Sequence, residues 1–197
     1  MALAIRDVRE HDLDAVLALN NEAGTGILAT DLDRLRHLYD IAHYFRVAEQ
    51  DGQILGFLIA MRPDAKYGSQ NFRWFRDHYE SFVYIDRIVI ASQSRGHGLG
   101  RIFYCDVQSY AEVRVPLLTC EVFLEPRNDQ TVLFHGTMGF QEVGQQKMDE
   151  GPKVSLLARE LPSFPFVRER YLEHGGLPDV TWLAERRRPV DAMGARA

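Results

Sequence analysis

No stretch of this sequence is apolar for the roughly 20 residues that a membrane-spanning helix needs. The first residues, MALAIRDVREHD, already include a charged side chain at Arg6. Cysteine is scarce, and Cys105 and Cys120 show no CxxC spacing, so we expect two reduced, buried thiols. The histidines form no grouping typical of metal ligands, so we expect no metal. These absences predict a cytoplasmic protein that binds neither membranes nor metals.

An excess of positive charge is also missing. Lys and Arg total 23 against 28 Asp and Glu, a formal net charge of -5, which argues against a general role in binding nucleic acid. The 197 residues are 46% hydrophobic and 26% charged, which is ordinary for a globular chain with room for one domain and a tail.

Hydrophobic periodicity predicts a mixed α/β fold. Asp51-Gly52 is a hairpin signal, Thr30 and Asp33 resemble a capping box that opens a helix, and residues 63–80 look irregular. We expect strands at 3–8, 44–49, 53–61, 82–91, 117–123, 140–146 and 153–159, and helices at 11–22, after Thr30, at 99–113 and from Asn128 to about Thr137. This order predicts a hairpin-built sheet that carries one β-α-β-α unit near its centre.

The character of the chain changes after residue 160. Four prolines punctuate residues 161–197, and only Val167–His174 has a helical pattern. We therefore expect a domain over residues 1–160 and a C-terminal appendage over 161–197, which could wrap the domain, contact a partner subunit or be mobile.

A glycine-rich turn carries the clearest chemical signal. Residues 93–100 (QSRGHGLG) follow a buried strand and precede a helix, where free N–H groups and the helix dipole attract phosphate. A P-loop would need Gly-Lys-Ser/Thr where Gly100-Arg101-Ile102 stands, and a dinucleotide fingerprint would lack a glycine in either register. The R-x-x-G-x-G turn of acyl-CoA-dependent acetyltransferases fits without gaps, on Arg95, Gly98 and Gly100.

Through this turn the sequence resembles the GNAT superfamily of N-acetyltransferases, as a small-amine-type member, over roughly residues 3–159. The family pattern N-x-x-A-x-x-x-Y-x-x-x-G-F is matched in spacing by Asn128, His135 and Gly139-Phe140, with Thr131 in place of the alanine. The resemblance implies a GNAT-like, mostly antiparallel sheet with a central acyl-CoA-binding unit. It also implies that acetyl-CoA is held, pyrophosphate in the turn and pantetheine along the strand, by Ile88, Val89, Ile90, Arg95, Gly96, His97, Gly98, Leu99, Gly100, Arg101, Asn128 and Phe134.

Acetyl transfer to an amine needs a group that removes a proton. Two carboxylates on predicted central strands are candidates, Glu121 and Asp86, because burial raises a carboxyl pKa toward neutrality. Cys120-Glu121-Val122 resembles the Leu-Glu-Val of family members whose glutamate acts as the base. The alternative is an ion pair with Arg87 or Arg101, and Tyr84 and Glu80 are weaker candidates for the base.

His135 stands where the family often has a tyrosine that protonates the departing thiolate. Histidine can donate at neutral pH, so a direct catalytic role is one interpretation. The other is that His135 only packs or caps its short helix.

An aromatic stretch lies between residues 62 and 82. It either packs a loop against the core or forms a wall of the acceptor pocket, with Arg73 and Arg76 available to pair with an acceptor carboxylate. Its members are Tyr67, Phe72, Trp74, Phe75, Tyr79 and Phe82.

These observations predict an N-acetyltransferase that moves an acetyl group from acetyl-CoA, as co-substrate, to a primary amine by direct attack within a ternary complex. The acceptor is a small molecule or a peptide, and a homodimer is an open alternative to a monomer. A catalytically silent acyl-CoA-binding sensor or partner module is the alternative function; it would keep Arg95, Gly98 and Gly100 without needing Glu121 or His135. A nucleotide-binding α/β protein is a weaker alternative, because the glycine and lysine that it needs are missing.

Overall fold

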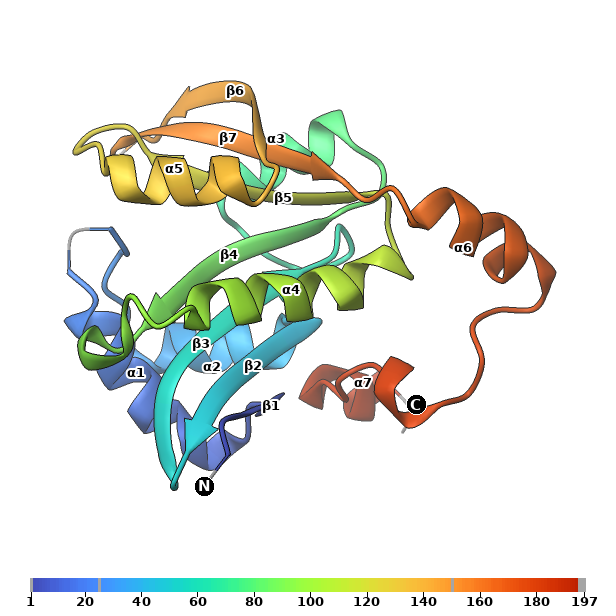
Figure 1. Ribbon diagram of the computed structural model, residues 1–197, viewed down its shortest axis with the longest axis horizontal. Helices are drawn as coiled ribbons and strands as arrows, with labels where there is room; N and C mark the ends of the chain where they lie inside the picture. The colour runs from blue at the N-terminus through green and yellow to red at the C-terminus, as the bar shows by residue number, and fades with distance from the viewer. Residues whose placement is uncertain (1, 25, 150, 195–197) are drawn as a thin grey trace. The chain divides into compact units, whose positions relative to one another are not determined.

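The computed structural model describes residues 2–24, 26–149 and 151–194 (Figure 1). The strands are β1 (Ala4–Asp7), β2 (Tyr44–Gln50), β3 (Gln53–Met61), β4 (Val83–Ile90), β5 (Leu117–Phe123), β6 (Gln141–Lys147) and β7 (Lys153–Glu160). They hydrogen-bond in the order β1-β2-β3-β4-β5-β7-β6. β4 and β5 run parallel, whereas β1–β2, β2–β3, β5–β7 and β6–β7 are antiparallel. The predicted mixed α/β fold with a mostly antiparallel sheet is therefore confirmed.

The helices are α1 (Leu13–Glu22), α2 (Leu32–Ile41), α3 (Gln70–His78), α4 (Leu99–Glu112), α5 (Asp129–Thr137), α6 (Phe164–Arg170) and α7 (Pro189–Gly194). Asn128 caps α5 as predicted, because its side chain accepts a hydrogen bond from the backbone N–H of Thr131. The predicted Thr30 capping box for α2 is wrong: Asp31 is extended and its carboxylate accepts the N–H of Arg34 at 2.8 Å.

Helix α3 corrects the expectation that residues 63–80 are irregular. Ser69 caps it by accepting the backbone N–H of Phe72 at 3.4 Å, and Phe72 and Phe75 are fully buried one turn apart. Arg73 and Arg76 stand on the exposed side of the same helix. The helical period thus directs the aromatic residues into the core and these two arginines away from it.

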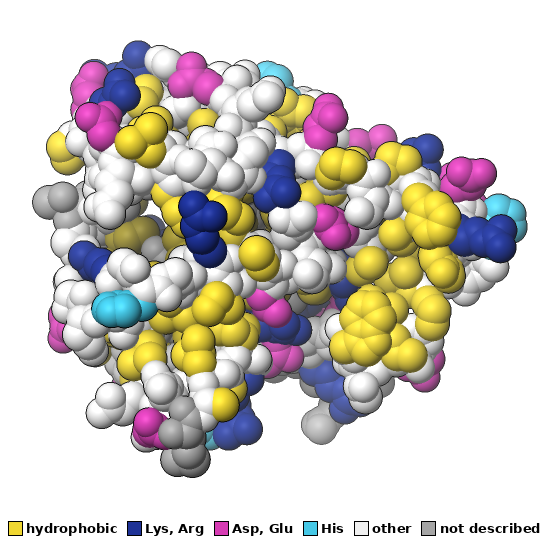
Figure 2. Space-filling model, in the orientation of Figure 1, with side chains coloured by type: hydrophobic (Ala, Val, Ile, Leu, Met, Phe, Trp, Pro, Cys, Tyr) yellow, Lys and Arg dark blue, Asp and Glu magenta, His cyan; other side chains and the backbone are white. Residues whose placement is uncertain are grey.

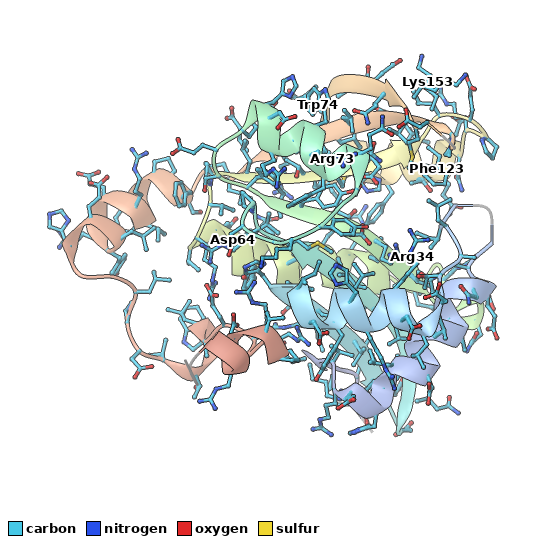
Figure 3. The ribbon with its side chains drawn as sticks, turned by 180° about the vertical axis from the view of Figure 1, so that it is seen from behind. Arg34, Asp64, Arg73, Trp74, Phe123 and Lys153 are labelled. Atoms are coloured by element: carbon cyan, nitrogen blue, oxygen red, sulfur yellow. The ribbon has the colours of Figure 1, made fainter. Side chains whose placement is uncertain are left out.

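The chain divides into two compact units. The first contains residues up to Met61, Asp86–Phe103 and the residues from Glu185; there α1 and α2 lie together on one face of β1, β2 and β3 (Figure 1). The second contains Arg62–Ile85 and Tyr104–Ala184; there α3 and α5 cover opposite faces of β5, β7 and β6 (Figures 1 and 3). β4 contributes residues to both units.

The core of the first unit forms on the β2–β3 hairpin. Asp51 and Gly52, at its turn, have φ of 53° and 78°, the values of the predicted two-residue turn. Gly56 on β3 permits a close approach of β4, since a Cβ there would lie 2.7 Å from the carbonyl oxygen of Val89. The fully buried side chains of this core include Val16, Leu35, Phe45, Val47, Phe57 and Ile59.

An aromatic cluster forms the core of the second unit under α3. Phe72 contacts Tyr84 with ring centroids 5.4 Å apart, and Phe75 and Phe82 join them, all fully buried. Trp74 of α3 is half-buried against β6, because a Cβ built on Gly144 of that strand would lie 2.9 Å from its indole ring. The packing interpretation of the aromatic stretch is therefore confirmed for the three phenylalanines.

The C-terminal residues pack on both units. Within the second unit Arg114 of α4 donates to the carbonyl of Leu183, and within the first Arg186 donates to the carbonyl of Ala42 at 3.0 Å. The helical segment begins three residues before the predicted Val167, at Phe164. Hydrophobic side chains gather over α6 and the residues after it (Figure 2), where Trp182 is 75% exposed.

Both cysteines are free thiols, but only Cys120 is buried. Cys105 is exposed on α4, so the expectation of a buried thiol is wrong at this position. Periodicity explains the difference, because the neighbouring positions Phe103, Tyr104 and Val107 define the buried face of α4.

Candidate functional site

The glycine turn forms an open loop at the start of α4. Gly96 and Gly98 have φ of 80° and 83°, values that only glycine adopts without strain, and α4 begins at the next residue, Leu99. The carbonyl of Gly98 accepts the N–H of Ile102 at 3.1 Å, so the helix is already formed at the turn. Successive backbone N–H groups at a helix N-terminus form a concavity suited to a phosphate.

Arg95 holds this loop in place. Its Nε donates to the carbonyl of Ile90 at 3.1 Å and its Nη2 to the carbonyl of Ala23 at 3.3 Å, which ties the turn to the ends of β4 and α1. His97 and Arg101 are exposed beside it.

The space above the glycines is open. No atom of the described residues outside the immediate chain neighbours lies within 4 Å of a Cβ built on Gly96 or Gly98. A pyrophosphate therefore fits this turn: it requires backbone N–H groups that it can reach, and the two glycines leave them uncovered.

β4 leads into the turn through Ile88, Val89 and Ile90. Val89 is buried, whereas Ile88 and Ile90 are partly exposed. The parallel pairing between β4 and β5 covers Val83–Ile85 and Leu118–Cys120, although the strands continue to Ile90 and Phe123.

Asp86 is charge-paired within the first unit. Its Oδ2 lies 2.6 Å from Nε of Arg87, and their side chains are only 5% and 13% exposed. Arg87 also donates to Oδ1 of Asn20 at 2.9 Å, and Asn20 donates to the carbonyl of Leu28. The predicted ion pair with Arg87 is confirmed, and this network fastens β4 to the segment between α1 and α2.

Glu121 lies in a different environment, on β5 in the second unit. Its Oε1 accepts two hydrogen bonds, from the hydroxyl of Tyr84 at 2.9 Å and from Nδ2 of Asn71 at 3.0 Å. Tyr84 and Asn71 are 0% and 1% exposed, so both donors are fixed by packing. Two converging donors orient a carboxylate and stabilise its charged form.

Asn71 was not singled out by the sequence, because residues 63–80 look irregular there. Its Oδ1 is buried and has no hydrogen-bond partner among the described residues. Leaving a buried carbonyl oxygen unsatisfied costs about 1–3 kcal/mol. A cap signal at Ser69, two residues before Asn71, could have revealed the helix that positions this amide.

His135 is 5% exposed on α5 and uses both ring nitrogens. Its Nδ1 lies 2.8 Å from the carbonyl of Thr131, and its Nε2 lies 2.6 Å from the hydroxyl of Tyr104. Because a carbonyl can only accept, Nδ1 carries the proton and Nε2 accepts from Tyr104. Burial lowers the pKa of His135 below its ordinary value, with the bond to Thr131 opposing it, so the ring is neutral.

The base candidate and the acid candidate lie on opposite faces of β5. Cys120 and Glu121 are consecutive, so their side chains point to opposite faces. Glu121 bonds to Asn71 of α3, whereas Cys120 bonds to Tyr104, the partner of His135. Burial raises the pKa of both Tyr104 and Cys120, so this second group is neutral as well.

The two remaining candidates lie at α5. Asn128 is occupied as its N-cap, with Oδ1 3.1 Å from the N–H of Thr131. Phe134 is half-buried and meets Tyr104 edge to face, with centroids 5.1 Å apart.

Within the described ranges no group of His, Cys, Asp and Glu is arranged to hold a metal ion. Over the same residues no helix is both long and apolar enough to cross a membrane.

The sequence model of the acetyltransferase (GNAT) family matches residues 12–140, and the chain therefore belongs to this family. That span contains the glycine turn, β5 and α5. No curated protein sequence is a significant match.

Solved acetyltransferase structures share the fold at low sequence identity. The ribosomal-protein-S18-alanine N-acetyltransferase from Escherichia coli superposes with a TM-score of 0.63 at 16% identity, covering 81% of this chain and 94% of its own. Naa20 from Chaetomium thermophilum, in complex with a bisubstrate analogue, superposes with a TM-score of 0.64 at 18% identity, and the match covers 89% of this chain and 92% of its own. The structure of yncA from Salmonella typhimurium with its cofactor acetyl-CoA superposes with a TM-score of 0.59 at 18% identity, and the match covers 82% of this chain and 95% of its own.

Proposed function

We propose that this chain is an N-acetyltransferase that transfers an acetyl group from acetyl-CoA to a primary amine by direct attack within a ternary complex. The observation that carries the proposal is the open turn at Gly96 and Gly98, which fits the pyrophosphate of coenzyme A in a chain of the GNAT family. Bound acetyl-CoA supplies an activated acetyl thioester. The protein supplies the anion site, the proton acceptor and the surroundings of the departing thiolate.

Glu121 is the proposed base. It is held by two neutral donors, whereas Asp86 is already paired with the guanidinium of Arg87. A proton on Asp86 would cost the largely buried ion pair with Arg87, so Asp86 is the less suitable proton acceptor. In the proposed step an ammonium gives one proton to Glu121, the amine nitrogen attacks the thioester carbon and the carbon–sulfur bond breaks. The nitrogen loses its second proton to the departing thiolate, so the products are the amide, the thiol of coenzyme A and protonated Glu121.

His135 is the proposed group on the sulfur side, acting as a neutral ring together with Tyr104. Its Nδ1–H is engaged at the carbonyl of Thr131 and its Nε2 at the hydroxyl of Tyr104, so donation to the sulfur requires one of these two hydrogen bonds to open. This role is modest, because a thiolate is already a fair leaving group.

The acceptor is proposed to be a small-molecule or peptide amine. The Escherichia coli enzyme is named for a protein alanine acceptor, and it shares the fold of this chain. A cytoplasmic location and a homodimer also remain predictions. Sedimentation of the wild type beside Trp182→Ser would test the homodimer, since Trp182 is an exposed apolar side chain of the C-terminal segment.

Thiol release from acetyl-CoA with a panel of amines tests the proposal. The panel contains spermidine, phenylalaninamide and tetrapeptide amides that begin with alanine, serine or methionine. We expect release with at least one amine and a loss of about 10²–10⁴-fold in kcat for Glu121→Gln, since a missing base removes a transition-state interaction. Acetyl-CoA binding without release on any amine would favour the silent acyl-CoA-binding module. Full turnover in both Glu121→Gln and Asp86→Asn across pH 6–9 would show that neither carboxylate is the base.

A further inference from the structure

The strongest unexplained feature outside the glycine turn is the side chain of Asn71. It comes from α3, which lies on the side of β5, β6 and β7 that Figure 3 faces. Its amide is 1% exposed, yet only one end of it is satisfied: Nδ2 donates to Glu121, while Oδ1 has no donor among the described residues.

The orientation of this amide is dictated by its neighbour. A carboxylate oxygen only accepts, so the end of Asn71 that lies 3.0 Å from Oε1 of Glu121 must be the NH₂ group. The sulfur of Met148, 3.8 Å from the same Nδ2, is also an acceptor. The carbonyl oxygen of Asn71 is therefore turned away from both and remains an acceptor in a buried place.

We propose that Asn71 binds the acceptor amine and positions the base. Its Oδ1 accepts a hydrogen bond from the incoming ammonium, and its Nδ2 holds the Glu121 carboxylate that takes the proton. An ammonium carries several N–H donors, so it can serve the Glu121 carboxylate and the Asn71 carbonyl together. After one proton moves to Glu121, a remaining N–H stays on Asn71 and the nitrogen lone pair is free to attack.

The arginines on the same helix do not share this position. Arg73 and Arg76 stand on the exposed side of α3, whereas Asn71 is buried and bonds to Glu121 of β5. The polar group that α3 directs at the proposed base is thus an amide. This inference rests on the proposed function, because it assigns Asn71 a role in the same reaction.

Steady-state kinetics with four variants tests the inference. The varied amine is the alanine tetrapeptide amide or, if that is inactive, the most active member of the panel. Asn71→Leu removes both the donor to Glu121 and the acceptor for the amine. We expect its amine KM to rise about tenfold or more, because a hydrogen bond to a charged group is lost, with the acetyl-CoA KM within about twofold of wild type. The acid limb of kcat/KM should move to higher pH, since the carboxylate loses a donor.

Tyr84→Phe and Asn71→Asp separate the two roles. Tyr84→Phe removes the other donor to Glu121 and should move the acid limb to higher pH without changing the amine KM. Asn71→Asp is isosteric and keeps an acceptor oxygen, but it places a second carboxylate beside Glu121. It should move the acid limb of the kcat/KM profile to a still higher pH and leave the amine KM no higher than in wild type. Asp77→Leu, on the exposed side of α3, is the matched control and should resemble wild type.

An amine KM unchanged in Asn71→Leu, or KM values for amine and acetyl-CoA that rise together, would overturn the inference while leaving the proposed function in place. If Asn71→Leu does not fold, an Asn71→Asp enzyme with a wild-type acid limb would overturn it instead. A wild-type protein that releases no thiol with any amine would overturn the proposed function, and this inference with it.

Discussion

Replacing His135 with phenylalanine should destabilise the protein, and the loss of stability relative to wild type should be smaller at acidic pH than at pH 8. The imidazole is 5% exposed and joins Tyr104 to Thr131 through two hydrogen bonds of 2.6 and 2.8 Å. Phenylalanine leaves the hydroxyl of Tyr104, itself 1% exposed, without this partner at about 1–3 kcal/mol, and loses the bond to the half-buried Thr131 at about 0.5–1.5 kcal/mol. The free energy of unfolding at pH 8 should fall by about 1.5–4.5 kcal/mol.

The pH dependence follows from the lowered pKa of His135 in the folded protein. As the pH falls below about 6.5, the unfolded chain takes up a proton that the folded chain does not, so wild-type stability decreases there. The decrease is at most about 1.4 kcal/mol per pH unit. The phenylalanine variant has no such group, so the difference between the two proteins should narrow.

Urea unfolding of wild type and His135→Phe at pH 8 and pH 5.5 measures this difference. His37→Phe, at an exposed position of α2, serves as the control and should stay close to wild type at pH 8. An equal penalty for His135→Phe at both pH values would refute a depressed pKa. A negligible penalty at pH 8 would refute the buried hydrogen-bonded arrangement.

Two further predictions follow from single contacts. His135→Tyr should retain more turnover than His135→Phe if a hydrogen-bond donor is needed beside the sulfur, and kcat of the two variants measured side by side distinguishes a donor from a filler. Gly56→Ala should lower the free energy of unfolding, because its Cβ would meet the carbonyl oxygen of Val89 at 2.7 Å. The stabilisation of up to about 1 kcal/mol that a glycine-to-alanine change brings at an unstrained position is too small to offset this clash. Thermal melts of Gly56→Ala that match wild type would contradict that close approach.

The order of strands and helices could be predicted because it depends on local signals. Asp51-Gly52 marks the β2–β3 turn, Asn128 marks the start of α5, and both signals act within a few residues of the backbone that they shape. Helix α3 was missed because its buried face is aromatic and its exposed face carries two arginines, which interrupts an aliphatic pattern. The cap at Ser69 was present in the sequence but has little weight without a recognised apolar stripe.

The candidate site was predictable only in part, for a similar reason. A turn such as residues 95–100 is defined by neighbours in sequence, so its glycines reveal it. The surroundings of Glu121 depend on Asn71, 50 residues away, and on Tyr84, 37 residues away, and no local pattern indicates such contacts. Nor could the sequence distinguish the charge-paired Asp86 from Glu121, since both appear as single carboxylates on central strands.

Calorimetric titration of acetyl-CoA into wild type, Gly98→Val and Gly52→Val tests the central claim most directly. Both glycines have positive φ, 83° and 78°, and open space around a built Cβ, so valine costs each variant a similar backbone strain of about 1–2 kcal/mol. Only Gly98 belongs to the proposed pyrophosphate turn. We predict that wild type and Gly52→Val bind acetyl-CoA with similar Kd, whereas Gly98→Val binds at least about tenfold more weakly because its side chain blocks approach to the backbone N–H groups. Equal affinity in all three proteins would contradict the assignment of this turn as the acetyl-CoA site.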